Sequence, residues 1–71
     1  MRYQRVESTC IQSIGYNAKH GVLGIRFKLS GLYQYFEVEK SVYRRFLNVK
    51  SKGKFFNRNI KAKAIEYQRI Y

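Results

Sequence analysis

The most regular alternation of apolar and polar side chains runs from residue 22 to residue 29. Its apolar members stand at every second position, and they are Leu23, Ile25, Phe27 and Leu29. Because successive side chains of a β-strand point to opposite faces, this spacing predicts a half-buried strand with these four residues on its core face. The opposite face is then expected to carry Gly24, Arg26 and Lys28.

Two shorter runs predict a strand on either side of this one. Residues 10–16 and 32–36 are rich in β-branched and aromatic side chains, and turn-forming residues at 17–21 and at Ser30-Gly31 separate them from the central run. Two successive hairpins of this kind form a three-stranded antiparallel meander. We expect residues 1–5 to be a loose tail, and residues 64–71 either to add an edge strand or to stay extended.

The second hairpin allows two registers, and the register decides where Tyr33 and Tyr35 point. A two-residue loop at Ser30-Gly31 would require Ser30 at positive φ, which a residue with a side chain resists. It would also place both tyrosines on an exposed face beside Arg26 and Lys28, as a platform on which bases could stack.

A three-residue loop at 29–31 instead puts its glycine at the left-handed position of a β-bulge, where glycine is favoured. Tyr33 then pairs with Phe27, and Tyr35 pairs with Ile25, so that both tyrosines join the core face. We favour this second register, in which the tyrosine pair is structural.

Helical spacing replaces strand spacing in the second half of the chain. Two adjacent apolar columns predict a helix over residues 40–48 that packs on the sheet, and they consist of Val42, Tyr43, Phe46 and Leu47. A second helix is predicted to begin with Ser51 as its N-cap, anchored by Phe56 and Ile60, which are four residues apart. The fold class is therefore α+β: one domain over residues 1–71, with a core at about 6–63, in which the meander packs against two short helices.

Positive charge changes this picture of an ordinary small domain. The chain carries a formal net charge of +11, and residues 40–63 hold nine Lys and Arg residues and no acidic residue. Such a concentration repels itself unless an anionic partner is present, and nucleic acid is a common partner of that kind. We expect the following residues to form a nucleic-acid-binding surface: Arg44, Arg45, Lys50, Lys52, Lys54, Arg58, Lys61 and Lys63.

The beginning of the second predicted helix is the most specific part of that surface. Lys52 and Lys54 lie in its first turn, where the helix dipole disfavours cations, and this misfit is explained if an anion binds there. Hydrogen bonds from Ser51, Asn57 and Asn59 could supplement the charges. Under the register that exposes them, Tyr33 and Tyr35 would add base stacking.

Other classes of site find little support. One cysteine (Cys10) and one histidine (His20) cannot build a zinc site, and we expect Cys10 to be a buried or half-buried apolar residue. No nucleophile stands near a base, no cofactor motif is present, and the four glutamates form no obvious catalytic pair. We expect neither metal, cofactor nor enzymatic activity. The N-terminus has no leader-like apolar segment and no run is long enough to span a membrane, so a cytoplasmic location is expected.

Two segments resemble the KTSC domain family, which occurs at the C-terminus of some lysyl-tRNA synthetases and as short stand-alone proteins of bacteria and phages. They are Tyr33-Gln34-Tyr35, followed by Val38, and residues 51–60, which contain the pattern Ser-x-Gly-x-aromatic-Phe-Asn. The resemblance covers about residues 6–61 and departs at Glu39, where the family often has Pro. Further matching positions are Ser8, Ile14-Gly15-Tyr16, Phe27 and Gly31. The resemblance implies a single fold unit and favours RNA, and it implies no catalytic residue.

Charge and resemblance together predict a small nucleic-acid-binding protein, with RNA favoured over DNA, that works mainly through phosphate contacts. The runner-up is a protein-interaction module, or an inhibitor, that docks on an acidic protein surface. A small nuclease is a third hypothesis, but it lacks a placed acid or histidine. The pattern leaves open whether the protein is a monomer or a dimer.

Overall fold

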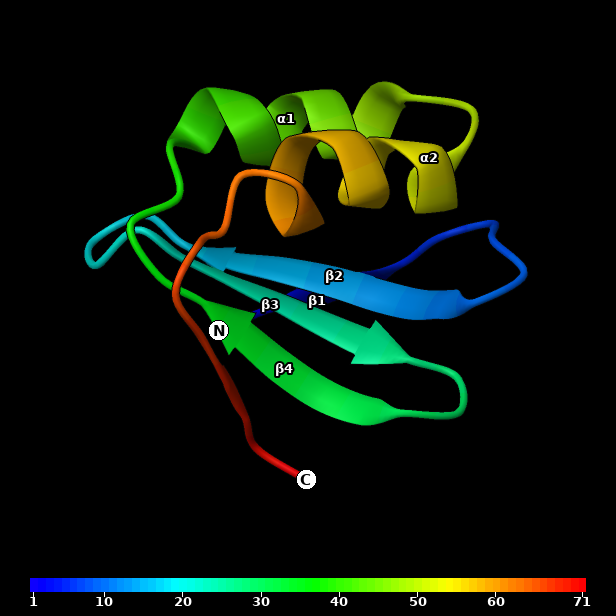
Figure 1. Ribbon diagram of the computed structural model, residues 1–71, viewed down its shortest axis with the longest axis horizontal. Coiled ribbons are helices and arrows are strands. Elements are labelled where there is room, and N and C mark those ends of the chain that lie inside the picture. The colour runs from blue at the N-terminus through cyan, green and yellow to red at the C-terminus, as the bar shows by residue number, and fades with distance from the viewer.

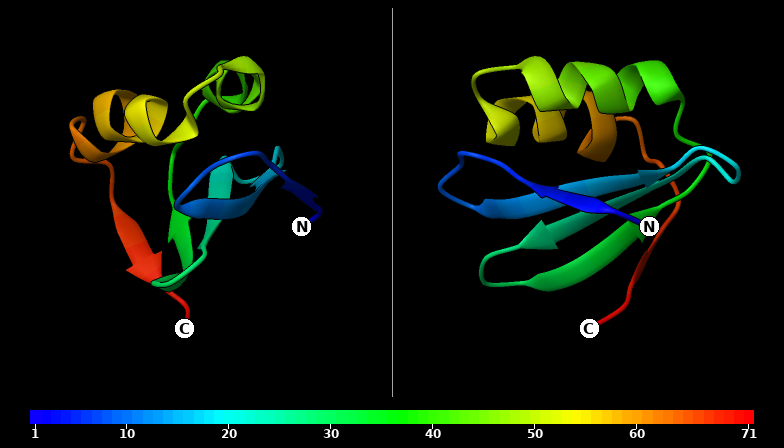
Figure 2. Two further views of the ribbon diagram at one scale, coloured as in Figure 1. Left: turned by 90° about the vertical axis from the view of Figure 1, so that its right-hand side faces the viewer. Right: turned by 180° about the vertical axis from the view of Figure 1, so that it is seen from behind.

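The chain folds into two layers, a five-stranded antiparallel sheet and a helical layer that covers one of its faces (Figure 1). The computed structural model describes all residues, 1–71. The strands follow chain order in the sheet: β1 (Tyr3–Arg5), β2 (Ile11–Asn17), β3 (Val22–Phe27), β4 (Gly31–Tyr35) and β5 (Tyr67–Arg69). The helical layer consists of α1 (Lys40–Asn48), α2 (Lys52–Phe56) and a π-helical turn, η1 (Asn57–Lys61), that continues α2. Figure 2 shows α1 and α2 on the same side of the sheet.

The α+β class and the two helices agree with the sequence-based prediction, but the sheet has two more strands than the predicted three-stranded meander. Residues 3–5, expected to be loose, form β1 and pair with residues 13–15 of β2. Residues 67–69 form β5 and pair with residues 33–35 of β4, which is the edge-strand alternative for the C-terminal segment. Three residues offer too few alternations for a pattern to show, so pairing with a neighbouring strand, rather than local sequence, defines these strands.

The β3–β4 hairpin has a three-residue loop, as favoured, but the loop lies one residue earlier than predicted. Phe27 pairs with Gly31, so Lys28, Leu29 and Ser30 form the loop. Leu29, assigned above to the core face, is therefore 98% exposed.

The register is consequently shifted by two residues from the favoured one, with Tyr33 opposite Ile25 and Tyr35 opposite Leu23. A shift of two preserves the face of every side chain, so both tyrosines do face the helical layer. The exposed-platform register is wrong. Gly31 has a φ of 101°, and a Cβ there would collide with the carbonyl oxygen of Tyr71, which accepts a hydrogen bond from the Leu32 amide. A glycine is thus required at position 31 because the C-terminal segment passes too close for any side chain.

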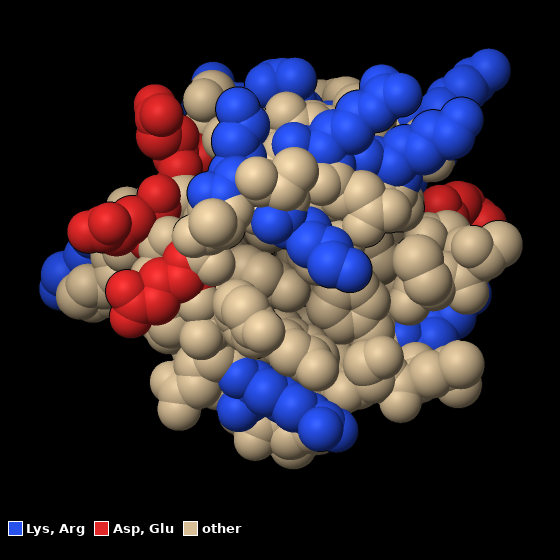
Figure 3. All heavy atoms as spheres, in the orientation of Figure 1, with Lys and Arg blue, Asp and Glu red and all other residues tan.

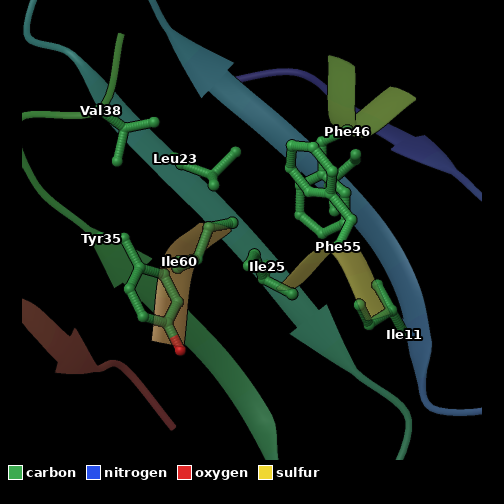
Figure 4. Packing of buried hydrophobic residues seen from close by; sticks show 9 residues of the cluster. Ile11, Leu23, Ile25, Tyr35, Val38, Phe46, Phe55 and Ile60 are labelled. Atoms are coloured by element: carbon green, nitrogen blue, oxygen red, sulfur yellow. The ribbon is translucent and has the colours of Figure 1, made fainter. Parts of the chain in front are cut away.

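The core lies between the sheet and the helices (Figure 4). Phe46 of α1 and Phe55 of α2 stack at a ring-centroid distance of 5.0 Å, and they join the two helices above the sheet. Five residues of β2, β3 and β4 point into this core: Ile11, Ile14, Leu23, Ile25 and Tyr35. Ile11 and Ile14 share a face although they are three positions apart, because the register of β2 shifts between Ile11 and Ser13. Such burial of large apolar side chains is the main source of stability in a domain this small.

Helix α1 is also attached to the sheet by an aromatic and polar contact. The Tyr16 ring of β2 stacks on Tyr43 of α1 at 5.1 Å, and its hydroxyl donates a hydrogen bond to the Val38 carbonyl at 2.5 Å. Tyr16 therefore attaches both α1 and the segment that leads into it to the sheet. Neither helix is long and apolar enough to cross a membrane.

The second helix begins as predicted but continues with a wider turn. The Ser51 hydroxyl accepts a hydrogen bond from the Lys54 amide, which makes Ser51 the N-cap of α2. Beyond Phe56 the backbone becomes π-helical, and the Ala62 amide donates to the Asn57 carbonyl, five residues back. As a result, Phe55 and Ile60, five residues apart, are the fully packed pair, whereas Phe56 is only half-buried.

The sheet face opposite the helices carries a small cluster of its own. The Tyr3 ring lies across Gly24, where a Cβ would collide with the Tyr3 hydroxyl. The guanidinium of Arg26 lies 5.6 Å from the centroid of the Tyr3 ring and 5.8 Å from that of Tyr71. One central arginine therefore contacts residues from both ends of the chain through cation–π interactions.

Candidate nucleic-acid interface

The helical layer carries most of the basic residues predicted to contact nucleic acid. Seven of the eight are exposed: Arg44 and Arg45 on α1, Lys50 in the α1–α2 connection, Lys54 on α2, Arg58 and Lys61 on η1, and Lys63 just beyond it. Figure 3 shows Lys and Arg side chains crowded over the helices at the top of the molecule, with acidic side chains at its sides. The segregation of charge in the sequence is thus a segregation in space.

Lys52 is the exception, and its assignment to the binding surface is wrong. The residue is only 8% exposed, and its ammonium group donates hydrogen bonds to the carbonyl oxygens of Leu47, at 3.2 Å, and of Val49. These are carbonyl groups at the end of α1, which have no helical partner and carry partial negative charge. The misfit of a lysine in the first turn of α2 is therefore explained by the preceding helix and not by an external anion.

The polar residues predicted to supplement the charges are mostly used within the fold. The Ser51 hydroxyl caps α2, and the Asn59 amide donates to the Phe55 carbonyl at 3.3 Å. Asn57 is exposed on η1, and its backbone amide continues the helix by donating to the carbonyls of Gly53 and Lys54. The Ser51 hydroxyl and the Asn59 side-chain amide thus already have hydrogen-bond partners within the fold.

Cys10 also differs from expectation, because it is exposed and not buried. It lies in the bend before β2, where its Sγ is 3.8 Å from the Ser8 hydroxyl. The short run that predicted its burial begins as a strand only at Ile11.

Tyr33 and Tyr35 line a pocket instead of an open stacking platform. The pocket lies between β3, β4 and β5 on one side and α2, η1 and the following segment on the other, and its volume is about 310 Å³. Eight of its ten lining residues are hydrophobic. Its aromatic walls come from Phe27, Tyr33, Tyr35, Phe56 and Tyr67.

The aromatic walls contact one another in a defined geometry. Phe56 meets Tyr35 edge-on at a centroid distance of 5.8 Å, and Tyr67 lies tilted against Tyr35 at 5.4 Å and against Tyr33 at 6.0 Å. Such edge-on and tilted contacts are the favoured geometries for aromatic pairs. The aromatic side chains of the pocket thus form one contiguous cluster across β4, β5 and α2.

Burial raises the pKa of the Tyr35 phenol to about 12, and the neighbouring Tyr33 and Tyr67 phenols add to the shift. The hydroxyl consequently stays protonated and uncharged throughout the physiological range. It can both donate and accept a hydrogen bond at the pocket wall.

This shift predicts an alkaline loss of stability. The unfolded chain deprotonates Tyr35 near its ordinary pKa of 10.0, whereas the folded chain holds the proton until about 12, so the free energy of unfolding should fall as pH rises from about 10 to about 12. Tyr35→Phe removes the ionising group. Urea unfolding between pH 9 and 12 should therefore show a steeper decline for the wild type than for this variant, and parallel curves would contradict the assignment.

The chain matches the family model of the KTSC domain over residues 7–63, most of its length. The chain belongs to the KTSC domain family. A crystal structure of a KTSC domain protein from Yersinia pestis is similar to it with a TM-score of 0.94 and 37% sequence identity, covering 99% of this chain and 97% of the other.

Two relatives match by sequence over most of their length. A protein from Tsukamurella paurometabola is 36% identical over 58 residues, which is 82% of this chain and 87% of the relative. An uncharacterized protein from Stutzerimonas stutzeri is 30% identical over 70 residues and covers 99% of both chains.

The two segments that carried the KTSC resemblance meet at the pocket. Tyr33 and Tyr35 come from the first segment, and Phe56 and Ile60 come from the second. These residues could be identified from the sequence but the pocket could not, because its walls also come from β3 and β5. The only sequence signal for the far wall was the incomplete alternation of residues 64–71.

Proposed function

We propose that this KTSC protein binds nucleic acid, RNA in preference to DNA, through phosphate contacts made by the helical layer. The observation that supports the proposal most directly is the concentration of eight exposed Lys and Arg residues on that layer, the seven predicted ones and Lys40, in a segment that contains no acid. The four glutamates lie outside that segment, at positions 7, 37, 39 and 66. A surface of this kind attracts a phosphate backbone by releasing its condensed counterions.

The binding residues of the proposal are Arg44, Arg45, Lys50, Lys54, Arg58, Lys61 and Lys63. Lys52 is not among them, since its ammonium group is used by α1. The preference for RNA rests on the synthetase context from which the family takes its name. No residue of the chain is proposed to be catalytic.

Salt dependence tests the proposal. If about five phosphates are contacted at once, log K should fall by about 3.5 per log unit of salt on a single strand and by about 4.5 on duplex DNA. The measurement is the affinity for labelled single-stranded RNA and for duplex DNA, determined by fluorescence anisotropy at several salt concentrations between about 50 and about 300 mM. An affinity that stays flat over this range would contradict an electrostatic interface.

The alternative function, docking on an acidic protein, predicts a different result when the protein is purified from its native cell. Nucleic acid that co-purifies with the chain gives a high 260/280 nm absorbance ratio, which nuclease treatment lowers. A stoichiometric acidic protein that survives nuclease treatment, with no salt-dependent binding of RNA, would instead support the docking function.

A further inference from the structure

The aromatic pocket is not needed for the phosphate contacts proposed above. It is lined by five aromatic side chains and opens beside η1, which provides Ile60 at its wall and Lys61 at its edge. Ile60 is buried, whereas Lys61 is exposed. The pocket therefore joins an apolar, aromatic interior to the edge of the basic helical layer.

The volume and the lining of the aromatic pocket are typical of a small-molecule binding site. A volume of about 310 Å³ stands at the lower end of the range of roughly 300–1,000 Å³ found for small-molecule pockets, which are likewise mostly apolar with a few polar groups. The polar groups here are the phenols of Tyr33, Tyr35 and Tyr67. None of them forms a hydrogen bond within the protein, in contrast to Tyr16, whose hydroxyl bonds to Val38.

The wall opposite the sheet departs from regular backbone geometry. η1 is a π-helical turn, a feature that is often found at functional sites. Ala64, which also lines the pocket, has a φ of 54°, in the left-handed region that costs a residue with a side chain about 1–2 kcal/mol. The fold thus maintains an unfavourable backbone conformation at this wall, as is common around binding sites.

These features complement one kind of ligand, a flat aromatic ring attached to an anionic chain. The aromatic walls offer contact to the ring, the phenols offer hydrogen bonds to its polar edge, and the cation at the edge of the pocket offers charge to a neighbouring phosphate. An apolar peptide side chain would use the walls but neither the free phenols nor the adjacent positive charge.

We propose that the pocket receives one unstacked base of single-stranded RNA, while Lys61 and the basic helical layer contact the flanking phosphates. Splayed bases of single-stranded RNA are commonly recognised by aromatic side chains in this way. This inference rests on the proposed function and adds to it a site that distinguishes single strands from duplexes, whose bases are already stacked and paired.

Tyr67 is the residue with which to test the base pocket. It is 59% exposed and lies outside the buried core cluster, and Tyr71, on the opposite sheet face, is exposed to the same extent and provides a matched control. The probes are a labelled single-stranded RNA hexamer and an abasic hexamer with the same backbone. Tyr67→Ala should weaken binding of the base-bearing probe by about fivefold to about 150-fold and leave the abasic probe unaffected.

Tyr71→Ala should leave both affinities unchanged. Circular dichroism and thermal unfolding check that both variants are folded. Because the chain contains no tryptophan, Tyr67→Trp also provides a single fluorescent reporter, whose emission should be quenched by the base-bearing probe and not by the abasic one. This second variant tests the pocket even if Tyr67→Ala disturbs β5.

The outcomes separate the two proposals. If Tyr67→Ala binds the base-bearing probe as tightly as the wild type does, with the same steep salt dependence, the base pocket is overturned and the phosphate interface is retained. If neither probe shows salt-dependent binding to the wild-type protein, the proposed function is overturned and, with it, the base pocket. A change in oligomeric state of Tyr67→Ala by sedimentation equilibrium, with no change in RNA affinity, would assign the pocket to self-association and also overturn the inference.

Discussion

Replacing Arg44, Lys54 and Arg58 together by glutamine should weaken binding to single-stranded RNA by about 100-fold at 0.1 M salt. Each phosphate contact to a single strand contributes about 0.7 to the slope of log K against log salt, which at 0.1 M amounts to about fivefold in affinity. The three residues stand on α1, α2 and η1 respectively, so the triple variant removes charge along the whole helical layer. The salt slope itself should fall by about 2.

These three residues are suitable because their side chains are exposed and none is used by the fold. Arg45 is left in place since its guanidinium lies 5.3 Å from the centroid of the Phe55 ring, and Lys61 is left because it lines the pocket. Exposed substitutions of this kind usually change stability by less than about 0.5 kcal/mol each.

The matched control is the triple replacement of Arg2, Lys19 and Lys28 by glutamine. All three are exposed, lie outside the helical layer and lower the net charge by the same amount. This control should retain most of the affinity. Equal losses in the two triple variants would show that net charge, and not the helical layer, attracts RNA.

Lys52→Met should lower the free energy of unfolding by about 1.5–3 kcal/mol, the usual contribution of a hydrogen bond to a charged group. Methionine keeps most of the aliphatic stem of the lysine but cannot donate to the Leu47 and Val49 carbonyls at the end of α1. In a domain of this size the corresponding fall in Tm is about 10–20 °C. Urea unfolding and calorimetry provide the measurement.

Lys54→Met is the control for this prediction, because Lys54 is two residues away and exposed. It should leave stability almost unchanged and weaken RNA binding, whereas Lys52→Met should weaken stability and leave the RNA affinity of the folded protein almost unchanged. If both variants unfolded at the same urea concentration, the structural role of Lys52 would be wrong.

The contrast between these lysines shows what the sequence could not reveal. Lys52 and Lys54 are the same residue type in the same predicted turn, and local pattern treats them alike. Their difference depends on where α1 ends, because its terminal carbonyl groups lie within reach of Lys52 only. Because the end of α1 packs against the beginning of α2, Lys52 has a structural role and Lys54 remains exposed.

The sheet illustrates the same limit in another way. The preference for a three-residue loop correctly predicted which face each tyrosine occupies, because a register that is shifted by two residues leaves every side chain on the same face. The register depends on loop placement and on the passage of the C-terminal segment by Gly31, and neither is encoded in the hairpin itself. The pocket escaped prediction for this reason, since Tyr67 comes to it only through the pairing of β5 with β4.

The position of Arg26 between Tyr3 and Tyr71 has a consequence for how the chain ends behave. Strands β1 and β5 are separated by three other strands, yet residues at both ends contact the same guanidinium. Detachment of either end exposes that group to water, which weakens its attraction to the remaining ring. Local unfolding of β1 and local unfolding of β5 are therefore thermodynamically coupled, so that detachment of one end favours detachment of the other although the two strands do not pair.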